Sequence, residues 1–205
     1  MKLYGANGSP FFRKARVVLE EKGLSYETEN LVPVPKTPAL LAMHPLGKIP
    51  ILRDGEVVVP DSSVICAYLE KKYPSPALYP ADPAEFAKAL FLEEYADTRM
   101  AEAMGGVFFE RFVKRFVLQQ APDEARVAEL LANAVPPVLD YLEGQVPADR
   151  DTLLARFSIA DAALGAHLGS LTFSGVALDA GRWPRTARYY EALLKRPSFV
   201  VATSL

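Results

Sequence analysis

Apolar positions follow different spacings in the two halves of the chain. Residues 1–75 contain short apolar or alternating runs of strand length between helical stretches, whereas helical spacing prevails from Ala84 onward. The first half predicts the order strand, helix, strand, helix, strand, strand, helix, with strands at 2–5, 25–31, 50–53 and 56–59 and helices at 10–22, 39–43 and 62–73. The first three of these elements form a βαβ unit of ~30 residues.

A hairpin is predicted near the end of this order. The pair Asp54-Gly55 separates the apolar run Ile51-Leu52 from a β-branched run at 57–59, which is a strong short-hairpin signal. Pro50 stands where the first of these strands begins, one of the few positions at which a sheet accepts proline. A proline there can adopt a cis peptide bond, which would turn the backbone N–H and C=O of Ile49 outward.

Proline and glycine divide the rest of the chain. The segment 76–83 is rich in proline and lacks periodicity, which predicts a semi-extended linker between a domain at 1–75 and an all-helical domain at 84–205. Within the helical domain, Gly105-Gly106 is expected to kink or end the first long helix. Pro136-Pro137 should kink a later one.

The end of the helical domain carries two further signals. Ser158 and Asp161 form a capping box directly before a helix rich in alanine and glycine, which suits a tightly packed central helix. We expect Asp161 to serve folding and not catalysis. Trp183-Pro184 opens a last helix, which is expected to end before Pro197.

Composition narrows the range of functions. The chain has 205 residues, half of them apolar, and a formal charge of −2 without a block of lysine and arginine, which argues against nucleic acid as a partner. A single cysteine excludes an internal disulfide and a Cys-x-x-Cys pair. There is neither a signal peptide nor an apolar run of the ~20 residues that a membrane span requires, so we expect a cytoplasmic protein.

Asp61-Ser62 is a candidate binding site. Serine before the helical run of Val64 and Ile65 predicts that Ser62 is the N-cap residue, and a helix N-terminus offers free N–H groups to a carboxylate. With Asp61 beside it, the pair could hold the amine and carboxylate of a small zwitterion such as an α-amino acid.

The order Gly47-Lys48-Ile49-Pro50, hairpin, Asp61-Ser62, helix resembles the glutathione-binding half of the glutathione S-transferase family. The resemblance covers nearly the whole chain and implies an α/β thioredoxin-like N-terminal domain and an all-α helical-bundle C-terminal domain. It implies that Ile49, before a cis Pro50, pairs with the cysteinyl unit of glutathione, that Asp61 and Ser62 hold its γ-glutamyl end, and that Lys48 lies near its glycine carboxylate. His44 stands where many relatives carry asparagine, and it could touch the glycine end.

Ser9 is the candidate catalytic residue. Serine followed by Pro10 predicts a helix N-cap, where a hydroxyl and the helix dipole could stabilise the thiolate of glutathione. The run from Ser9 to Arg16 resembles the serine-type or cysteine-type (omega-like) start of these enzymes, and serine favours transfer over reduction through mixed disulfides. We expect Arg13 and Arg16 to be solvated surface residues and Asn7 to form the turn.

The acceptor substrate is expected to be a small hydrophobic electrophile. Candidate residues for its pocket are apolar, namely Phe12, Met100, Met104 and Phe108, although aromatic residues at helical spacing more often belong to a core. No histidine and carboxylate cluster has metal-ligand spacing, so glutathione is the only cofactor expected. The sequence identifies neither the physiological acceptor nor the class within the family.

Two other functions remain open at this point. The same fold could bind glutathione as a regulatory or interaction protein with little catalysis, or could direct the activated thiolate to a peroxide or an isomerisable substrate. The family usually forms two-fold dimers, so a homodimer is expected by resemblance.

Overall fold

The structure is a computed structural model that describes residues 1–204. It divides into two compact units, one containing Met1–Tyr79 together with the chain from Pro197 onward, and the other containing Pro80–Arg196. The expected domain boundaries, by comparison, assign residues 84–205 to a single helical domain. In the described part of the chain, no helix combines the length and apolar character needed to cross a membrane.

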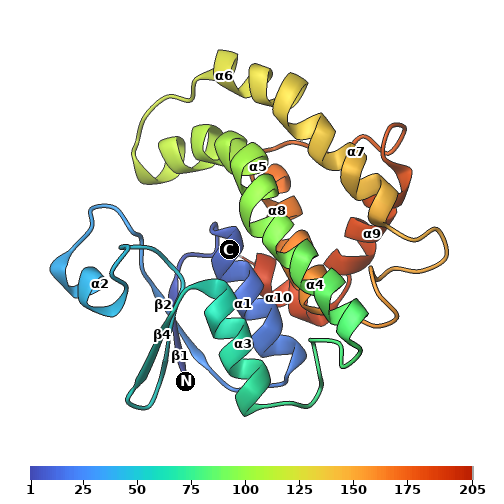
Figure 1. The fold of residues 1–205 in the computed structure, drawn as a ribbon. Helices are drawn as coiled ribbons and strands as arrows, with labels where there is room; N and C mark the ends of the chain where they lie inside the picture. Colours follow the sequence, from blue (N-terminus) through green and yellow to red (C-terminus); the bar gives the residue numbers. More distant parts are fainter. Residues whose placement is uncertain (205) are drawn as a thin grey trace. The chain divides into compact units, whose positions relative to one another are not determined.

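The first unit is a small mixed sheet with helices (Figure 1). Its elements are β1 (Lys2–Gly5), α1 (Pro10–Glu21), β2 (Glu27–Asn30), α2 (Pro38–Met43), β3 (Ile51–Asp54), β4 (Val57–Pro60), α3 (Ser62–Lys72) and, after the second unit, α10 (Pro197–Thr203). The strand order is β2-β1-β3-β4, with β1 and β2 parallel and the other two pairs antiparallel. The predicted order of elements up to α3 is confirmed, including the hairpin turn at Gly55.

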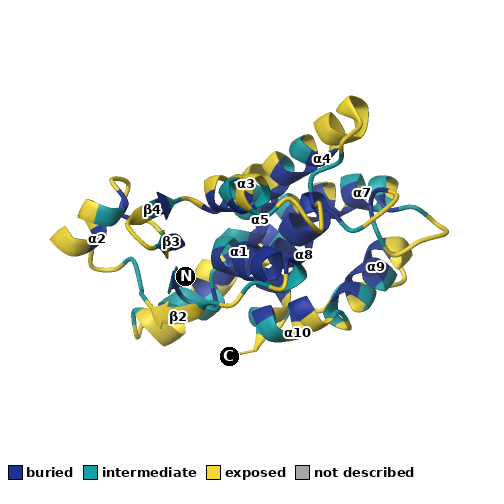
Figure 2. Ribbon diagram, turned by 90° about the horizontal axis from the view of Figure 1, so that it is seen from below, coloured by how far each residue is buried: buried dark blue, intermediate teal, exposed yellow. Residues whose placement is uncertain are grey.

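Helix α1 forms the centre of the first unit. It packs against α3 on one side and against α10 on the other, and its residues from Phe12 to Leu19 are all buried (Figure 2). The sequence pattern does not predict helix α10, because it favours Pro197 as the end of a helix. A proline has no N–H to lose at the first helical position, and here it begins α10. The Ser198 hydroxyl fixes that helix by donating a hydrogen bond to Glu21 (2.5 Å).

The second unit is entirely helical in its described residues. Its elements are α4 (Pro83–Tyr95), the π-helical η1 (Ala96–Met100), α5 (Ala101–Phe108), the π-helical η2 (Phe109–Val117), α6 (Glu124–Glu129), the π-helical η3 (Leu130–Ala134), α7 (Val135–Gln145), α8 (Ile159–Phe173) and α9 (Pro184–Leu194). Elements α4 to η2 follow one another without a break, as do α6 to α7. Helix α8 packs against α4, η1, α5 and α9 and is buried from Ile159 to Leu171, so it is the core of this unit.

The prediction that Gly105-Gly106 ends the first long helix is wrong. Both glycines lie inside α5, and the helix continues through them. The reason for glycine at the second position is packing: a Cβ on Gly106 would lie 2.8 Å from Cδ1 of Leu130, whereas a Cβ on Gly105 would meet nothing within 4 Å. The small residue therefore allows η3 to approach α5 closely.

The capping box before α8 is present. Ser158 and Asp161 satisfy each other's polar groups at the helix N-terminus, and the Asp161 carboxylate is completely buried. It accepts hydrogen bonds from Leu153 N–H (2.9 Å), Ser158 N–H (2.9 Å), the Ser158 hydroxyl (3.1 Å) and the Tyr189 hydroxyl (3.0 Å). The carboxylate therefore joins the incoming loop, α8 and α9.

Candidate functional site

Strand register brings the predicted site segments to one edge of the sheet. Tyr4 pairs with Ile51, and Ile51 pairs with Pro60. Because the three strands are successively antiparallel, the end of β1, the start of β3 and the end of β4 lie at the same edge. The loop that leads to Ser9, the segment that ends at Pro50 and the pair Asp61-Ser62 therefore leave the sheet together.

Ser9 is the N-cap residue of α1, as predicted. Its hydroxyl oxygen accepts a hydrogen bond from Phe12 N–H (3.4 Å), and Pro10 occupies the first turn. The side chain is half-buried. Since the oxygen acts as an acceptor toward the helix, the hydroxyl proton points elsewhere and can be donated to an anion at the positive end of α1.

Two arginines fix the loop before Ser9. Arg13 donates to the backbone carbonyls of Gly8 (2.6 Å) and Asn7 (3.1 Å), and Arg16 donates to the Asn7 side-chain oxygen (2.8 Å). The Asn7 amide in turn donates to the backbone carbonyl of Ser204 (2.8 Å). The prediction that these arginines are solvated surface residues is wrong, since Arg13 is 1% and Arg16 9% exposed. Loop carbonyls that face the interior need donors, and the arginines supply them.

Close packing also constrains the start of this loop. Gly5 ends β1, and a Cβ at this position would lie 2.2 Å from Cδ2 of Phe12. Phe12 is 1% exposed, so its ring is already held by the core. Glycine is therefore required at position 5 because the ring of Phe12 occupies the space of a side chain.

The segment before β3 has the predicted backbone form. The Ile49–Pro50 peptide bond is cis, Ile49 is half-buried and Lys48 is exposed. Gly47 has a φ of +61°, and its N–H donates to the His44 carbonyl (2.7 Å), which closes a turn directly before Lys48. The Lys36 ammonium donates to the carbonyl of Leu46 (3.0 Å) and covers the same turn.

His44 is buried, at 4% exposure. Its Nδ1 accepts a hydrogen bond from Leu46 N–H (3.3 Å), so the neutral ring carries its proton on Nε2. Burial lowers the pKa of His44 below its usual value, while the charge of Asp61 works against this shift and that of Lys48 adds to it. His44 is therefore a neutral imidazole at pH 7 that experiences the charges of both Lys48 and Asp61.

Asp61 and Ser62 exchange the roles expected for the helix terminus. Asp61 is the N-cap residue, and its Oδ1 accepts from Ser63 N–H (2.9 Å) and Val64 N–H (3.4 Å), whereas Ser62 is the first residue of α3. The prediction that Ser62 is the cap is therefore wrong by one position. Asp61 also has a φ of +75°, a conformation that costs a non-glycine residue about 1–3 kcal/mol and is found preferentially at functional sites.

Lys14 lies beside the predicted Asp61-Ser62 site, and the sequence gives no indication of this position. It is completely buried, and its ammonium donates to the Ser63 hydroxyl (2.9 Å) at the N-terminus of α3. Its neighbours Arg13 and Arg16 share this burial. Three cations within four residues are typical of a solvated helix face, so no signal in the sequence indicates that these three side chains are buried.

The residues predicted for an acceptor pocket are all buried. Exposure is 1% for Phe12, 0% for Met100 and Met104 and 8% for Phe108, whose ring stacks on Phe112 with a centroid distance of 4.8 Å. Within residues 1–204, no group of three or more histidine, cysteine, aspartate or glutamate side chains could hold a metal ion. His167 pairs instead with Asp97 (3.1 Å) inside the second unit.

Comparison with known proteins decides the family. The family model described as glutathione S-transferase, N-terminal domain, matches residues 3–77, and the corresponding C-terminal domain matches residues 124–192. The chain belongs to the glutathione S-transferase family. The thioredoxin-like domain and the helical domain expected from the resemblance are thereby confirmed.

Curated relatives in this family carry several descriptions. Glutathione S-transferase 3 of Zea mays is 34% identical over 97% of this chain and 91% of its own length. The uncharacterized GST-like protein YibF of Escherichia coli is 33% identical over 97% and 96%. The maleylacetoacetate isomerase of Pseudomonas aeruginosa is 32% identical over 97% and 93%.

Solved structures agree with this assignment. A glutathione S-transferase from Rhodospirillum rubrum F11 has a TM-score of 0.91 at 28% identity and covers 100% of this chain and 92% of its own. A glutathione S-transferase from Methylobacterium radiotolerans, in complex with glutathione sulfonate, has a TM-score of 0.80 at 31% identity, with coverage of 98% and 93%.

Proposed function

We propose that this protein is a glutathione transferase in which Ser9 stabilises the glutathione thiolate for attack on a hydrophobic electrophile. The observation that carries the proposal is the position of the Ser9 hydroxyl. Its oxygen accepts from Phe12 N–H at the N-terminus of α1, which leaves its proton for the sulfur. The loop before it is held by the two buried arginines, so the hydroxyl is presented in a fixed place.

The energy required is within reach of this arrangement. A free thiol has a pKa of about 8.5, and each unit of depression needs about 1.4 kcal/mol of preference for the thiolate. A hydrogen bond from a hydroxyl to an anion supplies roughly 1.5–3 kcal/mol, and a helix N-terminus adds about 0.3–1 kcal/mol. Together they would lower the thiol pKa by about one to three units, and a depression of more than about 1.5 units makes thiolate the main form at pH 7.

The remaining predicted residues would hold the peptide. Oδ1 of Asp61 is occupied by the helix terminus, while Oδ2 stays available for the γ-glutamyl amine, and Ser62 would take the γ-glutamyl carboxylate. The backbone of Ile49 would pair with the cysteinyl unit, and the exposed Lys48 would meet the glycine carboxylate. Because His44 is buried and neutral, it would act as a positioning residue for the turn that presents Lys48.

The proposal is tested by turnover and by glutathione affinity in Ser9→Ala. We expect the rate of conjugation to fall by at least tenfold while the dissociation constant of glutathione changes by less than threefold, because the hydroxyl acts on the reactive sulfur and not on the peptide. Thr37→Ala is the matched control, since Thr37 caps α2 before a proline with a hydroxyl that accepts from Leu40 N–H (3.2 Å). Unchanged turnover in Ser9→Ala would contradict the proposal.

A second candidate activity is glutathione-dependent isomerisation. It is favoured by the relative described as maleylacetoacetate isomerase, and it would use the same activated thiolate. A binding protein of the same fold would instead retain glutathione without turning over any electrophile. A panel of aryl halides, peroxides and maleylacetoacetate separates these functions. Turnover of an aryl halide indicates transfer, turnover of a peroxide indicates peroxidase activity and turnover of maleylacetoacetate indicates isomerisation, whereas glutathione binding without turnover of any of them indicates a binding protein.

We also propose a cytoplasmic homodimer, as is typical of this family. Sedimentation at micromolar protein concentration tests the dimer directly. A single monomeric species of 22.5 kDa would contradict it.

A further inference from the structure

Helix α10 lies along α1 and ends at the loop that carries Ser9 (Figure 1). Its start is fixed to the end of α1, where the Ser198 hydroxyl donates to Glu21 (2.5 Å). Its end is fixed near the start of α1, where the Asn7 amide donates to the carbonyl of Ser204 (2.8 Å). The two helices therefore run in opposite directions, and a residue 197 positions further along the chain meets the loop before Ser9.

The loop before Ser9 is a tight turn, here called the Ser9 turn (residues 6–9). Ser9 N–H donates to the carbonyl of Ala6 (2.8 Å), which closes a four-residue turn with Asn7 at its second position. Arg13 donates to the carbonyls of Asn7 and Gly8 and so holds the backbone of the turn from α1. The Asn7 side chain adds a contact of a different kind, because it reaches away from the turn to α10.

The Asn7 amide joins the two helices. Its Oδ1 accepts from Nη1 of Arg16 (2.8 Å), while its Nδ2 donates to the carbonyl of Ser204 (2.8 Å). Arg16 is itself held, since its Nε donates to Tyr26 Oη (3.3 Å) and the Tyr26 hydroxyl donates to Glu20 (2.6 Å). An acceptor and a donor are thus needed at fixed places, and a side-chain amide supplies both.

The Ser204 carbonyl is fixed from within α10. The hydroxyl of Ser204 (2.7 Å) and its N–H (3.3 Å) both donate to the carbonyl of Val201. The Thr203 hydroxyl donates to the carbonyl of Phe199 (2.7 Å), and Phe199 is only 1% exposed. The acceptor that Asn7 meets therefore belongs to a helix end that is anchored in the core of the first unit.

We propose that the end of α10 positions the Ser9 turn, with Asn7 as the positioning residue that transmits this support to the Ser9 hydroxyl. The inference rests on the proposed role of Ser9 and adds a part of the chain to it that lies far from Ser9 in sequence. Asn7 stands two residues before Ser9 in a turn that the Ser9 N–H closes, so a shift of Asn7 moves the hydroxyl. A misplacement of about 1 Å at a reacting group can cost up to about 10²-fold in rate.

Absorbance titration of bound glutathione across pH, with variants at both ends of this contact, tests the inference. Asn7→Ala removes both bonds of the amide. Ser204→Pro leaves Asn7 intact, but it removes both donors of Ser204 and disfavours the helical conformation of Thr203, so the carbonyl moves.

We expect each variant to raise the thiol pKa of bound glutathione by at least about 0.5 pKa unit and, below that pKa, to lower the conjugation rate by about threefold. The dissociation constant of glutathione should change by less than about twofold, because the turn acts on the sulfur and not on the peptide. The double variant should shift the pKa no further than Asn7→Ala alone, because both changes remove the same contact.

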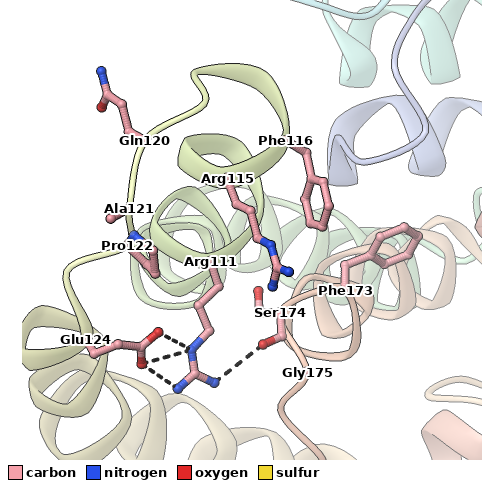
Figure 3. Close-up of a pocket in the computed structure, with 10 residues that line it drawn as sticks. All are labelled: Arg111, Arg115, Phe116, Gln120, Ala121, Pro122, Glu124, Phe173, Ser174 and Gly175. Carbon is pink, nitrogen blue, oxygen red and sulfur yellow. Dashed lines mark hydrogen bonds and ion pairs between the residues drawn. The ribbon is translucent and has the colours of Figure 1, made fainter.

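Ser198→Ala is the matched control, since it breaks the hydrogen bond at the opposite end of α10, beside the end of α1. Arg111→Met is a second control in the other unit. Arg111 donates to the carbonyl of Ser174 at the end of α8 (3.4 Å) and pairs with Glu124 (2.8 Å), so its loss removes a side-chain contact to a helix end of the same kind (Figure 3). Both controls should leave the thiol pKa within about 0.2 pKa unit of the wild-type value.

The inference is overturned if Asn7→Ala or Ser204→Pro has the thiol pKa of the wild type, if Ser198→Ala shifts it equally, or if the two changes add in the double variant. Ser9→Ala, measured beside them, separates this result from the proposed function. A lowered pKa that persists in Ser9→Ala removes the proposed function and this inference together. A pKa that returns to the free value in Ser9→Ala but stays low in Asn7→Ala overturns this inference alone.

Discussion

Asp161 provides a quantitative test of how the helical unit is held together. Its carboxylate is completely buried and accepts four hydrogen bonds: from Leu153 N–H, Tyr189 Oη–H, Ser158 N–H and Ser158 Oγ–H. Asp161→Asn keeps the shape and the acceptor that serves Leu153 and Tyr189. The new amide N–H groups, however, would face the two donors of Ser158, so two bonds are lost and buried donors are left unpaired.

The size of the effect follows from that count. An unsatisfied buried polar group costs about 1–3 kcal/mol, so Asp161→Asn should lower the free energy of unfolding by roughly 3–4 kcal/mol. Asp161→Ala loses all four bonds and should cost more, roughly 4–5 kcal/mol. Asp82→Ala is the control, because Asp82 is an exposed N-cap residue of α4, and removal of such a cap costs about 0.5–2 kcal/mol.

Urea unfolding followed by tryptophan fluorescence measures this effect in the relevant unit. The only tryptophan, Trp183, is the residue before α9 and lies in the same unit as Asp161; its indole N–H donates to Asp140 (2.7 Å). The reasoning is refuted if Asp161→Asn lowers the free energy of unfolding by less than about 1 kcal/mol, or by no more than Asp82→Ala does. In either case the hydrogen bonds to the Asp161 carboxylate would not be what joins α8, α9 and the loop.

Three further predictions address separate parts of the chain. Gly105→Ala should raise the free energy of unfolding by about 0.5–1 kcal/mol, because alanine is the better helix former and its Cβ meets no other atom. Gly106→Ala should be less stable than Gly105→Ala by at least ~1 kcal/mol, because its Cβ meets Leu130. Equal effects of the two substitutions in urea unfolding would disprove the packing argument. Asp61→Asn keeps the cap on α3 but removes the charge, so glutathione affinity measured by calorimetry should fall at least tenfold with little loss of stability; an unchanged affinity would remove Asp61 from the site. Burial works to raise the pKa of Glu143, but hydrogen bonds from the N–H groups of Thr186 and Arg185 and from the Thr186 hydroxyl outweigh burial and lower that pKa. The stability that the ionised Glu143 adds to the folded state is therefore complete above its unfolded-state pKa of about 4.5. It is lost as the pH falls through the lower folded-state pKa. Thermal unfolding of Glu143→Gln should therefore depend less on pH than that of the wild type below about pH 5.

The order of elements in the first unit could be predicted because local signals were strong. The Asp54-Gly55 turn, the Ser9-Pro10 cap and the strand-length apolar runs each specify their own structure through turn chemistry or capping. Register then follows from the hairpin, and it places Ser9, Pro50 and Asp61 at one sheet edge. The one-residue error at Ser62 arose because aspartate and serine are equally good caps, and only the backbone conformation distinguishes them.

Burial of charge could not be predicted. Arg13, Lys14 and Arg16 have the sequence pattern of a solvated helix face, yet all three are buried, because their partners are backbone carbonyls and polar side chains that are distant in sequence or lie in a loop.

The continuity of the helix through Gly105-Gly106 could not be predicted from the sequence either. Gly105-Gly106 has the local signature of a break, but the space that the missing side chain leaves is filled by Leu130 from η3. Tertiary packing therefore overrides propensity at this point. At Pro197 a proline begins a helix that returns to α1, a long-range contact that no local pattern records.

The central claim is that the Ser9 hydroxyl stabilises the thiolate of bound glutathione. A thiolate absorbance titration of bound glutathione across pH, with wild type, Ser9→Ala and Thr37→Ala side by side, tests it most directly. We predict a thiol pKa at least one unit below the value of free glutathione in wild type and in Thr37→Ala, and a pKa near the free value in Ser9→Ala. Bound glutathione with the same lowered pKa in Ser9→Ala, or with no lowered pKa in wild type, would contradict the account.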